Sequence, residues 1–291
     1  MNHLQGTGVA AVTPFNINGE IDFTGLEKLI NHMIDGGVDY IVSLGTTGET
    51  ATLSPEEKYK VWEFTTNVVD GRVPLVAGIG GNNTLEVAKQ IKNFSMKGYS
   101  AILSVRPYYS KPNQEGIYQH YKYLNSASSL PIILYNVPGR TGSNMSSETT
   151  CRLAHDFSNI VAIKEASANF DQFNAIMRDK PSNFSLISGD DPITLQMIAM
   201  GAIGVISVVG NALPTQFSSM VKACLTGDFN SARATHQNIL EFTRLLFSEG
   251  NPAGVKSALK SLNICEDYVR LPLVKASPGL EKLIQQELKS I

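Results

Sequence analysis

Cysteine and net charge are both scarce in this chain. Its 291 residues include three cysteines, Cys151, Cys224 and Cys265, which lie far apart. Without a C-x-x-C pair, this odd number indicates reduced thiols rather than a disulfide framework. The 24 basic and 26 acidic side chains give a formal net charge of −2, which offers no basic surface for nucleic acid or an anionic membrane. We therefore expect a small-molecule partner.

Metal-ligand patterns and long apolar runs are also absent. The five histidines, at positions 3, 32, 120, 155 and 236, form no His-x-x-x-His pair, so we predict no metal site. No apolar run approaches the ~20 residues that span a bilayer, and residues 1–6 do not begin a secretory signal. We expect a cytoplasmic protein without a membrane anchor.

A repeated pattern of strand and helix occupies most of the chain. Apolar, β-branched runs begin near positions 8, 38, 73, 100, 131, 159, 184 and 203, and amphipathic stretches follow most of them. This alternation predicts an α/β fold with parallel strands and right-handed crossovers. Eight units favour a closed (β/α)8 TIM barrel, although an open doubly wound sheet would give a similar sequence.

The strand pattern stops after residue 212. Stretches near 214–226, 228–247, 252–262 and 278–290 have helical patterning instead. We expect a catalytic barrel over residues 1–225 and a C-terminal helical extension over residues 226–291 that packs on it. Because barrel active sites lie where the strands end, chemistry is expected at those positions.

One predicted strand ends on a lysine. Residues 159–166 read Asn-Ile-Val-Ala-Ile-Lys-Glu-Ala, a run typical of a strand that is buried on both faces. Burial disfavours the ammonium form of Lys164 and favours the neutral amine, which is a nucleophile. The stretch alone is also compatible with a structural lysine that reaches solvent or pairs with Glu165.

Hydroxyl and cationic side chains follow other strands. Residues 45–49, Gly-Thr-Thr-Gly-Glu, can form either an anion pocket or only a capped turn. Arg140, just beyond the fifth strand, can bind a carboxylate or form a weak surface ion pair.

A lysine nucleophile also needs partners that move protons. Attack on a ketone requires protons to be delivered and removed near one carbon. We predict that Lys164 supplies the amine, while Tyr135, Thr46 and Tyr109 supply a relay of hydroxyl groups.

The strand-end motifs occur together in one order. They are Gly45-Thr46-Thr47-Gly48-Glu49, Pro107-Tyr108-Tyr109, Tyr135-Asn136-Val137-Pro138, Ile163-Lys164-Glu165, Ser188-Gly189-Asp190-Asp191 and Gly204-Val205-Ile206-Ser207. In this combination the chain resembles the pyruvate-dependent class I aldolases and lyases of the dihydrodipicolinate synthase type over its whole length. The resemblance implies a lyase that holds pyruvate as a Schiff base on Lys164 and needs no cofactor.

The resemblance also implies roles for further residues. Thr46 and Thr47 would hold the pyruvate carboxylate, and the backbones of Gly189 and Ile206 would line the pocket. Tyr109 would reach into the active site of a neighbouring subunit, which implies a homo-oligomer, expected to be a homotetramer built as a dimer of dimers.

The second substrate depends on Arg140. It resembles the residue that binds the carboxylate of L-aspartate 4-semialdehyde in the family members on the route to diaminopimelate and lysine. The alternatives are another pyruvate-dependent aldolase, such as an N-acetylneuraminate lyase or a 2-keto-3-deoxy sugar-acid aldolase, and a catalytically silent barrel kept for binding or regulation.

Two further features come from the same resemblance. Lysine-inhibited relatives bind lysine at the dimer interface, where Asn82, Glu86 and Tyr108 match but Lys58 replaces a frequent histidine. Because Lys58 would repel the ammonium of bound lysine, we expect weak or absent feedback inhibition. Arg106 stands where the family usually has a small or polar residue, and its role is left open.

Overall fold

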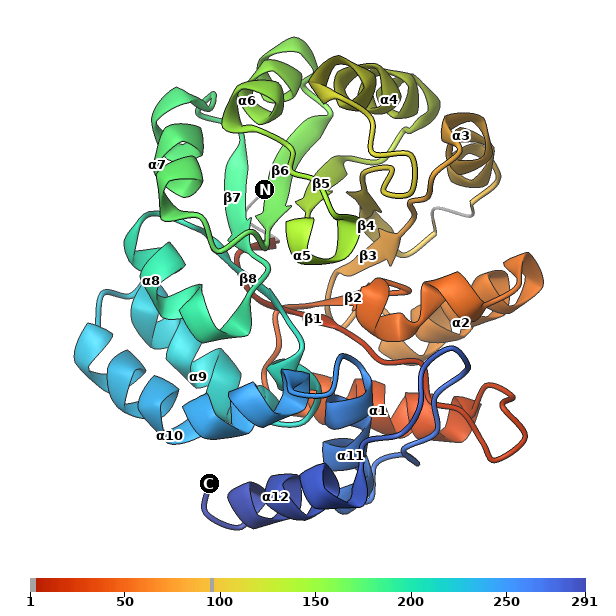
Figure 1. Cartoon of the computed structure of the whole chain (residues 1–291), viewed down its shortest axis with the longest axis vertical. Helices are drawn as coiled ribbons and strands as arrows, with labels where there is room; N and C mark the ends of the chain where they lie inside the picture. The colour runs from red at the N-terminus through yellow and green to blue at the C-terminus, as the bar shows by residue number, and fades with distance from the viewer. Residues whose placement is uncertain (1–3, 95–96) are drawn as a thin grey trace.

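Parallel strands form a closed barrel at the centre of the molecule (Figure 1). The computed structural model describes residues 4–94 and 97–291. Within these ranges eight strands close the barrel, with β8 pairing to β1. They are β1 (Gly6–Ala10), β2 (Tyr40–Ser43), β3 (Leu75–Gly78), β4 (Tyr99–Val105), β5 (Ile132–Asn136), β6 (Ile160–Glu165), β7 (Ser185–Ser188) and β8 (Gly204–Ser207). The barrel prediction is confirmed, and the open-sheet alternative is wrong.

Each strand begins within two residues of its predicted start. The agreement follows from burial on both faces, which makes strand sequences almost continuously apolar. Along β5, Ile133 and Tyr135 belong to the apolar cluster inside the barrel, whereas Ile132 and Leu134 pack against the helices. The same alternation points Lys164 inward and Glu165 outward on β6.

Helices surround the barrel and continue beyond it. Those that follow the strands are α1 (Phe23–Asp35), η2 (Thr46–Gly48), η3 (Thr50–Thr52), α2 (Pro55–Val69), α3 (Thr84–Asn93), α4 (Gln114–Ala127), α5 (Pro138–Thr141), α6 (Ser147–Asp156), α7 (Phe170–Asp179), η4 (Asp191–Ile193), α8 (Thr194–Ala199), η5 (Val209–Asn211) and α9 (Pro214–Leu225). Figure 1 shows the short helix α5 inside the ring that the longer helices form. It therefore lies close to the strand ends.

The last three helices form a C-terminal region beside the barrel. They are α10 (Phe229–Phe247), α11 (Ala253–Ser261) and α12 (Pro278–Leu288). These helices contact one another, α10 also packs on α9, and in Figure 1 they lie on the side of α1 and α9. The predicted C-terminal helices are confirmed, while the division between residues 225 and 226 stays a prediction.

The fold shows the state of the cysteines and whether any helix or side-chain cluster suits a membrane or a metal ion. Cys151, Cys224 and Cys265 are all free and buried. Within the described ranges, no helix is long and apolar enough to cross a membrane. In the same part of the chain, no group of three or more His, Cys, Asp or Glu side chains is placed to hold a metal ion.

A buried histidine joins α3 to α4 and makes stability depend on pH. His120 is 3% exposed, and its Nδ1 lies 2.8 Å from the Thr84 hydroxyl. Burial lowers the pKa of His120 to about 4, whereas the unfolded chain has a pKa of about 6.5. Between these values the unfolded chain binds a proton that the folded protein does not, so stability rises with pH.

We expect His120→Gln to remove about 2 kcal/mol of the stability difference between pH 5 and pH 7.5. Urea unfolding at both pH values measures this difference. His155→Gln, at an exposed position on α6, is the matched control. An unchanged pH dependence in the His120 variant would show that the buried ring does not titrate as expected.

Candidate active site

Lys164 lies near the C-terminal end of β6, next to Tyr135 on the neighbouring strand. Its side chain is only 5% exposed, and its Nζ lies 4.6 Å from the centre of the Tyr135 ring. Tyr135 and Lys164 are register partners on β5 and β6. Gly189 leaves room for the lysine, because a Cβ at that position would come within 3.0 Å of the Lys164 Cε.

Lys164 neither reaches solvent nor pairs with Glu165, so both structural alternatives for this lysine are wrong. The side chain is buried and does not reach bulk solvent. Glu165 points to the opposite face of β6, where its carboxylate accepts hydrogen bonds from Asn136, Gln172 and the Ser167 amide. Successive residues of a strand face opposite sides, so adjacent Lys164 and Glu165 cannot pair. Burial raises the pKa of Glu165, although these donors oppose the shift.

Asp190 contributes to the electrostatics around the lysine. It directly follows Gly189 at the end of β7 and is partly buried. Burial raises its pKa, and the positive charge of Lys164 opposes that effect. The motif containing Asp190 was recognised in the sequence, but its interaction with Lys164 was not predicted, because it depends on the pairing of β6 with β7.

Two joined cavities lie above the strand ends. The inner one, about 40 Å³, is lined by Thr46, Tyr135 and eight neighbouring residues, among them Gly45 and Leu103. The outer one, about 530 Å³, shares Thr46, Thr50, Gly80 and Val105 with it. The structure therefore brings Thr46 and Tyr135 to one small cavity, with Lys164 against the Tyr135 ring. The larger cavity that shares its lining has space for a second molecule. Ile206 is buried among the apolar side chains inside the barrel.

A polar chain connects Thr47 to Arg140. The Asn251 side chain donates to the Thr47 Oγ1 at 2.9 Å, and the Asn251 carbonyl oxygen lies 3.5 Å from an Arg140 Nη2. Arg140 is exposed on α5 and lines the outer cavity. Asn251 lies more than 100 residues from either partner, so sequence reasoning did not identify it as a site residue.

Tyr109 does not line either strand-end cavity in a single chain. It is 88% exposed. The side-chain oxygen of Asn82 accepts hydrogen bonds from the amides of both Tyr108 and Tyr109. This contact fixes the turn that presents the Tyr109 side chain to the outside.

The four residues predicted for a lysine effector site are only partly assembled. Lys58 and Tyr108 line the outer cavity, and Asn82 contacts Tyr108. Glu86 lies exposed on α3 and is not among the lining residues of that cavity. Burial lowers the pKa of Lys58.

A buried ion pair holds the turn that carries Thr46. Glu49 lies at the end of that turn, and its carboxylate contacts the Lys256 Nζ at 2.6 Å, with both side chains fully buried. Lys256 also donates to the Tyr268 carbonyl oxygen, and the Arg270 amide donates to Glu49. Burial lowers the pKa of Lys256, and attraction to Glu49 opposes this. The pair therefore joins α11 to the active-site turn.

We expect Lys256→Met to lower the free energy of unfolding by about 3–5 kcal/mol, because it leaves the Glu49 carboxylate buried without its partner. Urea denaturation measures this loss. The matched control is the double variant Glu49→Gln/Lys256→Met, which should recover at least about half of the loss. A single variant as stable as the wild-type protein would contradict a structural role for the pair.

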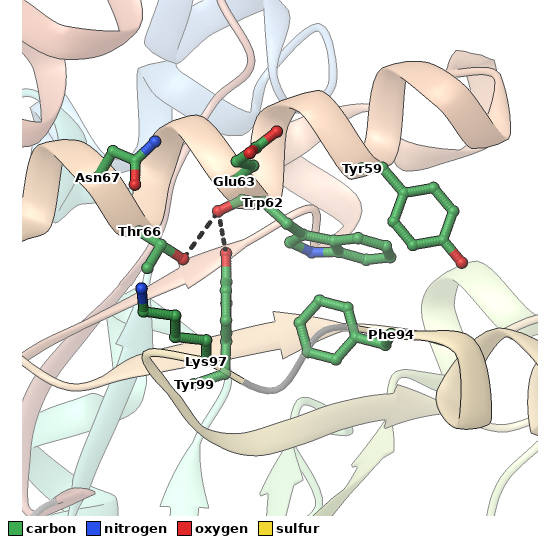
Figure 2. A pocket seen from close by; sticks show the side chains of 8 residues that line it. All are labelled: Tyr59, Trp62, Glu63, Thr66, Asn67, Phe94, Lys97 and Tyr99. Atoms are coloured by element: carbon green, nitrogen blue, oxygen red, sulfur yellow. Dashed lines mark hydrogen bonds between the residues drawn. The ribbon is translucent and has the colours of Figure 1, made fainter.

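A separate cavity of about 350 Å³ lies outside the barrel between α2 and the start of β4 (Figure 2). Its lining residues are Tyr59, Trp62, Glu63, Thr66, Asn67, Phe94, Lys97 and Tyr99. Trp62, Phe94 and Tyr99 stack edge to face, and the Tyr99 hydroxyl donates to the Trp62 carbonyl oxygen at 3.2 Å. These contacts are those of a packed cluster, and none of these residues was predicted to be functional.

The fold and the buried lysine at the strand ends define a (β/α)8-barrel enzyme. A family model described as the dihydrodipicolinate synthetase family matches residues 3–291. The chain therefore belongs to this family.

Relatives and solved structures agree with this assignment. The 4-hydroxy-tetrahydrodipicolinate synthase of Parabacteroides distasonis is 49% identical over 289 residues, which cover 99% of this chain and 97% of that protein. The 4-hydroxy-tetrahydrodipicolinate synthase of Flavobacterium psychrophilum is 48% identical over 291 residues, which cover 100% of this chain and 99% of that protein. The dihydrodipicolinate synthase from Aquifex aeolicus has a TM-score of 0.95 at 42% identity, with 98% and 97% coverage. A monomeric dihydrodipicolinate synthase variant has a TM-score of 0.96 at 39% identity, with 99% and 97% coverage.

Proposed function

We propose that this enzyme condenses pyruvate with L-aspartate 4-semialdehyde and so acts as a 4-hydroxy-tetrahydrodipicolinate synthase in lysine and diaminopimelate biosynthesis. The names of the relatives support this activity. The observation that carries it is the placement of buried Lys164 beside Tyr135, which lines the inner cavity, while Arg140 lines the outer cavity that shares residues with it. No cofactor is required, because the lysine itself activates pyruvate.

Schiff-base formation begins with the neutral amine of Lys164. The nitrogen attacks the ketone carbon of pyruvate to give a carbinolamine, which loses water to become an iminium ion. Loss of a proton from the adjacent methyl group then gives an enamine. Thr46 and Thr47 are the proposed contacts for the pyruvate carboxylate, and Gly189 leaves room beside the lysine side chain.

The second half of the reaction uses the aldehyde and the amine of L-aspartate 4-semialdehyde. The enamine carbon attacks the aldehyde carbon, and the aldehyde oxygen takes up a proton to become a hydroxyl group. The amino group then attacks the iminium carbon and displaces Lys164, which closes the ring and regenerates the enzyme. Per turnover, one pyruvate and one semialdehyde give one cyclic product and one water. Arg140 is the proposed partner of the semialdehyde carboxylate.

Proton transfer is assigned to Tyr135, Thr46 and Tyr109. Tyr135 and Thr46 line the same inner cavity, whereas Tyr109 is exposed on the single chain. We therefore propose that Tyr109 completes the relay of a neighbouring subunit and that the working enzyme is a homo-oligomer, expected to be a homotetramer. The lysine effector site remains part of this proposal, with weak inhibition expected because of Lys58.

Substrate comparison tests the proposed activity. Purified enzyme with pyruvate should consume L-aspartate 4-semialdehyde, and the product should be reduced by a coupled NADPH-dependent reductase. Incubation with N-acetylneuraminate or a 2-keto-3-deoxy sugar acid should release little pyruvate. Faster cleavage of either sugar acid than condensation with the semialdehyde would assign the enzyme to the sugar-acid branch, and absence of all three reactions would favour a catalytically silent barrel.

A further inference from the structure

The guanidinium of Arg106 is buried at the barrel rim, where no acidic side chain of the described residues contacts it. Arg106 is 0% exposed. It donates to the Ser143 and Thr141 hydroxyls at 2.6 Å each and approaches the Pro107 carbonyl oxygen at 3.5 Å. Its Nε has no hydrogen-bond partner among the described residues. Burying a cation without a neutralising carboxylate is costly. The presence of Arg106 therefore has to be explained by its hydrogen bonds to Thr141 and Ser143.

Arg106 lies directly behind the active site. The last register pair of β4 and β5 is Val105 with Tyr135. Arg106 follows Val105, and Asn136 follows Tyr135, so Arg106 lies beside Asn136. Asn136 is in turn the register partner of Glu165. Arg106, Asn136 and Glu165 thus form an outward-facing row that backs inward-facing Tyr135 and Lys164. Burial lowers the pKa of Arg106, and attraction to Glu165 opposes that shift.

Both hydroxyls that Arg106 contacts belong to the segment that carries Arg140. Thr141 ends α5, and its Oγ1 lies 3.0 Å from the carbonyl oxygens of Val137 and Ser143. The Arg106 contact therefore reaches both ends of this short helix through Thr141. Val137, Arg140 and Thr141 all line the outer cavity, so movement of α5 would move the wall that faces a second substrate.

We propose that Arg106 is a positioning residue for the second substrate, because its two contacts fix α5 to the end of β4 and hold Arg140 at the mouth of the cavity. A planar guanidinium presents several donors in a fixed arrangement and can serve both hydroxyls at once, whereas a lysine ammonium has no such fork. The kinetic consequence rests on the proposed function. The ordering of α5 does not.

Hydrogen exchange tests the positioning directly. The amides of Arg140, Thr141 and Gly142 are protected by bonds to Val137 and Pro138 within α5. In Arg106→Lys and in Ser143→Ala, peptides covering residues 138–143 should exchange about tenfold faster than in the wild-type enzyme. Arg178→Met, at an exposed position on α7, is the control and should leave this exchange unchanged. Unchanged exchange in both test variants overturns the proposal, whatever the substrate.

Steady-state kinetics test whether Arg106 affects use of the second substrate. Arg106→Lys should raise the KM for L-aspartate 4-semialdehyde about tenfold. The KM for pyruvate and the yield of the borohydride-trapped pyruvate adduct should stay within about twofold of wild type. In an Arg140→Ala background, Arg106→Lys should have almost no further effect on the semialdehyde, since the two residues act in series.

The outcomes separate this inference from the proposed function. A wild-type enzyme that does not use the semialdehyde refutes the function, while the exchange measurement still decides whether Arg106 orders α5. Equal rises in both KM values, or a full effect of Arg106→Lys without Arg140, overturn the positioning role. Lower thermal stability with unchanged exchange and kinetics overturns it as well and leaves Arg106 as a packing residue.

Discussion

Replacement of Lys164 by methionine is expected to lower kcat/KM by at least about 10⁴-fold and to abolish the pyruvate adduct. Methionine has a similar length but no nucleophilic nitrogen, so neither the carbinolamine nor the iminium ion can form. The folded structure should tolerate the change, because the lysine is buried and an apolar side chain avoids the cost of burying a charge. Steady-state assays and thermal unfolding of the same sample separate the two effects.

The matched control for this variant is Lys122→Met on the exposed face of α4. It removes one lysine at a distance from the cavity and should retain wild-type kinetics. If Lys164→Met retained activity within about tenfold of wild type, another nucleophile would have to form the adduct. A large loss of thermal stability would instead indicate that Lys164 has a structural role.

Arg140→Ala is expected to lower kcat/KM for L-aspartate 4-semialdehyde by about 10²–10³-fold. The guanidinium lines the outer cavity, where a bidentate contact with the substrate carboxylate would be partly shielded from water. The KM for pyruvate and the rate of adduct formation should change little, because the lysine and the inner cavity are intact. Initial rates with each substrate varied in turn measure both parameters.

Arg140→Lys distinguishes charge from geometry at this position. Lysine keeps the positive charge but cannot form the bidentate contact, so an intermediate loss is expected. Arg178→Ala, at a highly exposed position on α7, is the surface control. An Arg140→Ala enzyme with unchanged kcat/KM for the semialdehyde would remove the main reason for choosing this substrate over a sugar acid.

The fold was predictable because its signals are local. Eight short apolar runs are buried on both faces, and each remains visible in the sequence without knowledge of its neighbours. Barrel closure is less local, since it depends on pairing between β1 and β8, whose residues lie almost 200 positions apart. The count of units favoured closure, but only the structure excluded the open sheet.

The contacts that support the site were not predictable, because they join residues that lie far apart in the sequence. Glu49 appeared to be part of an anion-binding turn, yet its carboxylate pairs with Lys256 across 207 positions of sequence. Asn251 and Arg106 likewise act through distant partners. Strand-end residues such as Lys164 and Tyr135 could be proposed because the barrel brings all strand ends to one face, but the residues that orient them depend on tertiary packing.

Borohydride reduction in the presence of pyruvate, followed by peptide mass mapping, tests the central claim most directly. Reduction converts the iminium ion into a stable secondary amine, so the modified lysine can be identified in a digest. We predict one pyruvate-derived adduct, located on Lys164, whose formation also inactivates the enzyme. An unmodified Lys164 peptide, or an adduct on a different lysine, would contradict the proposed mechanism.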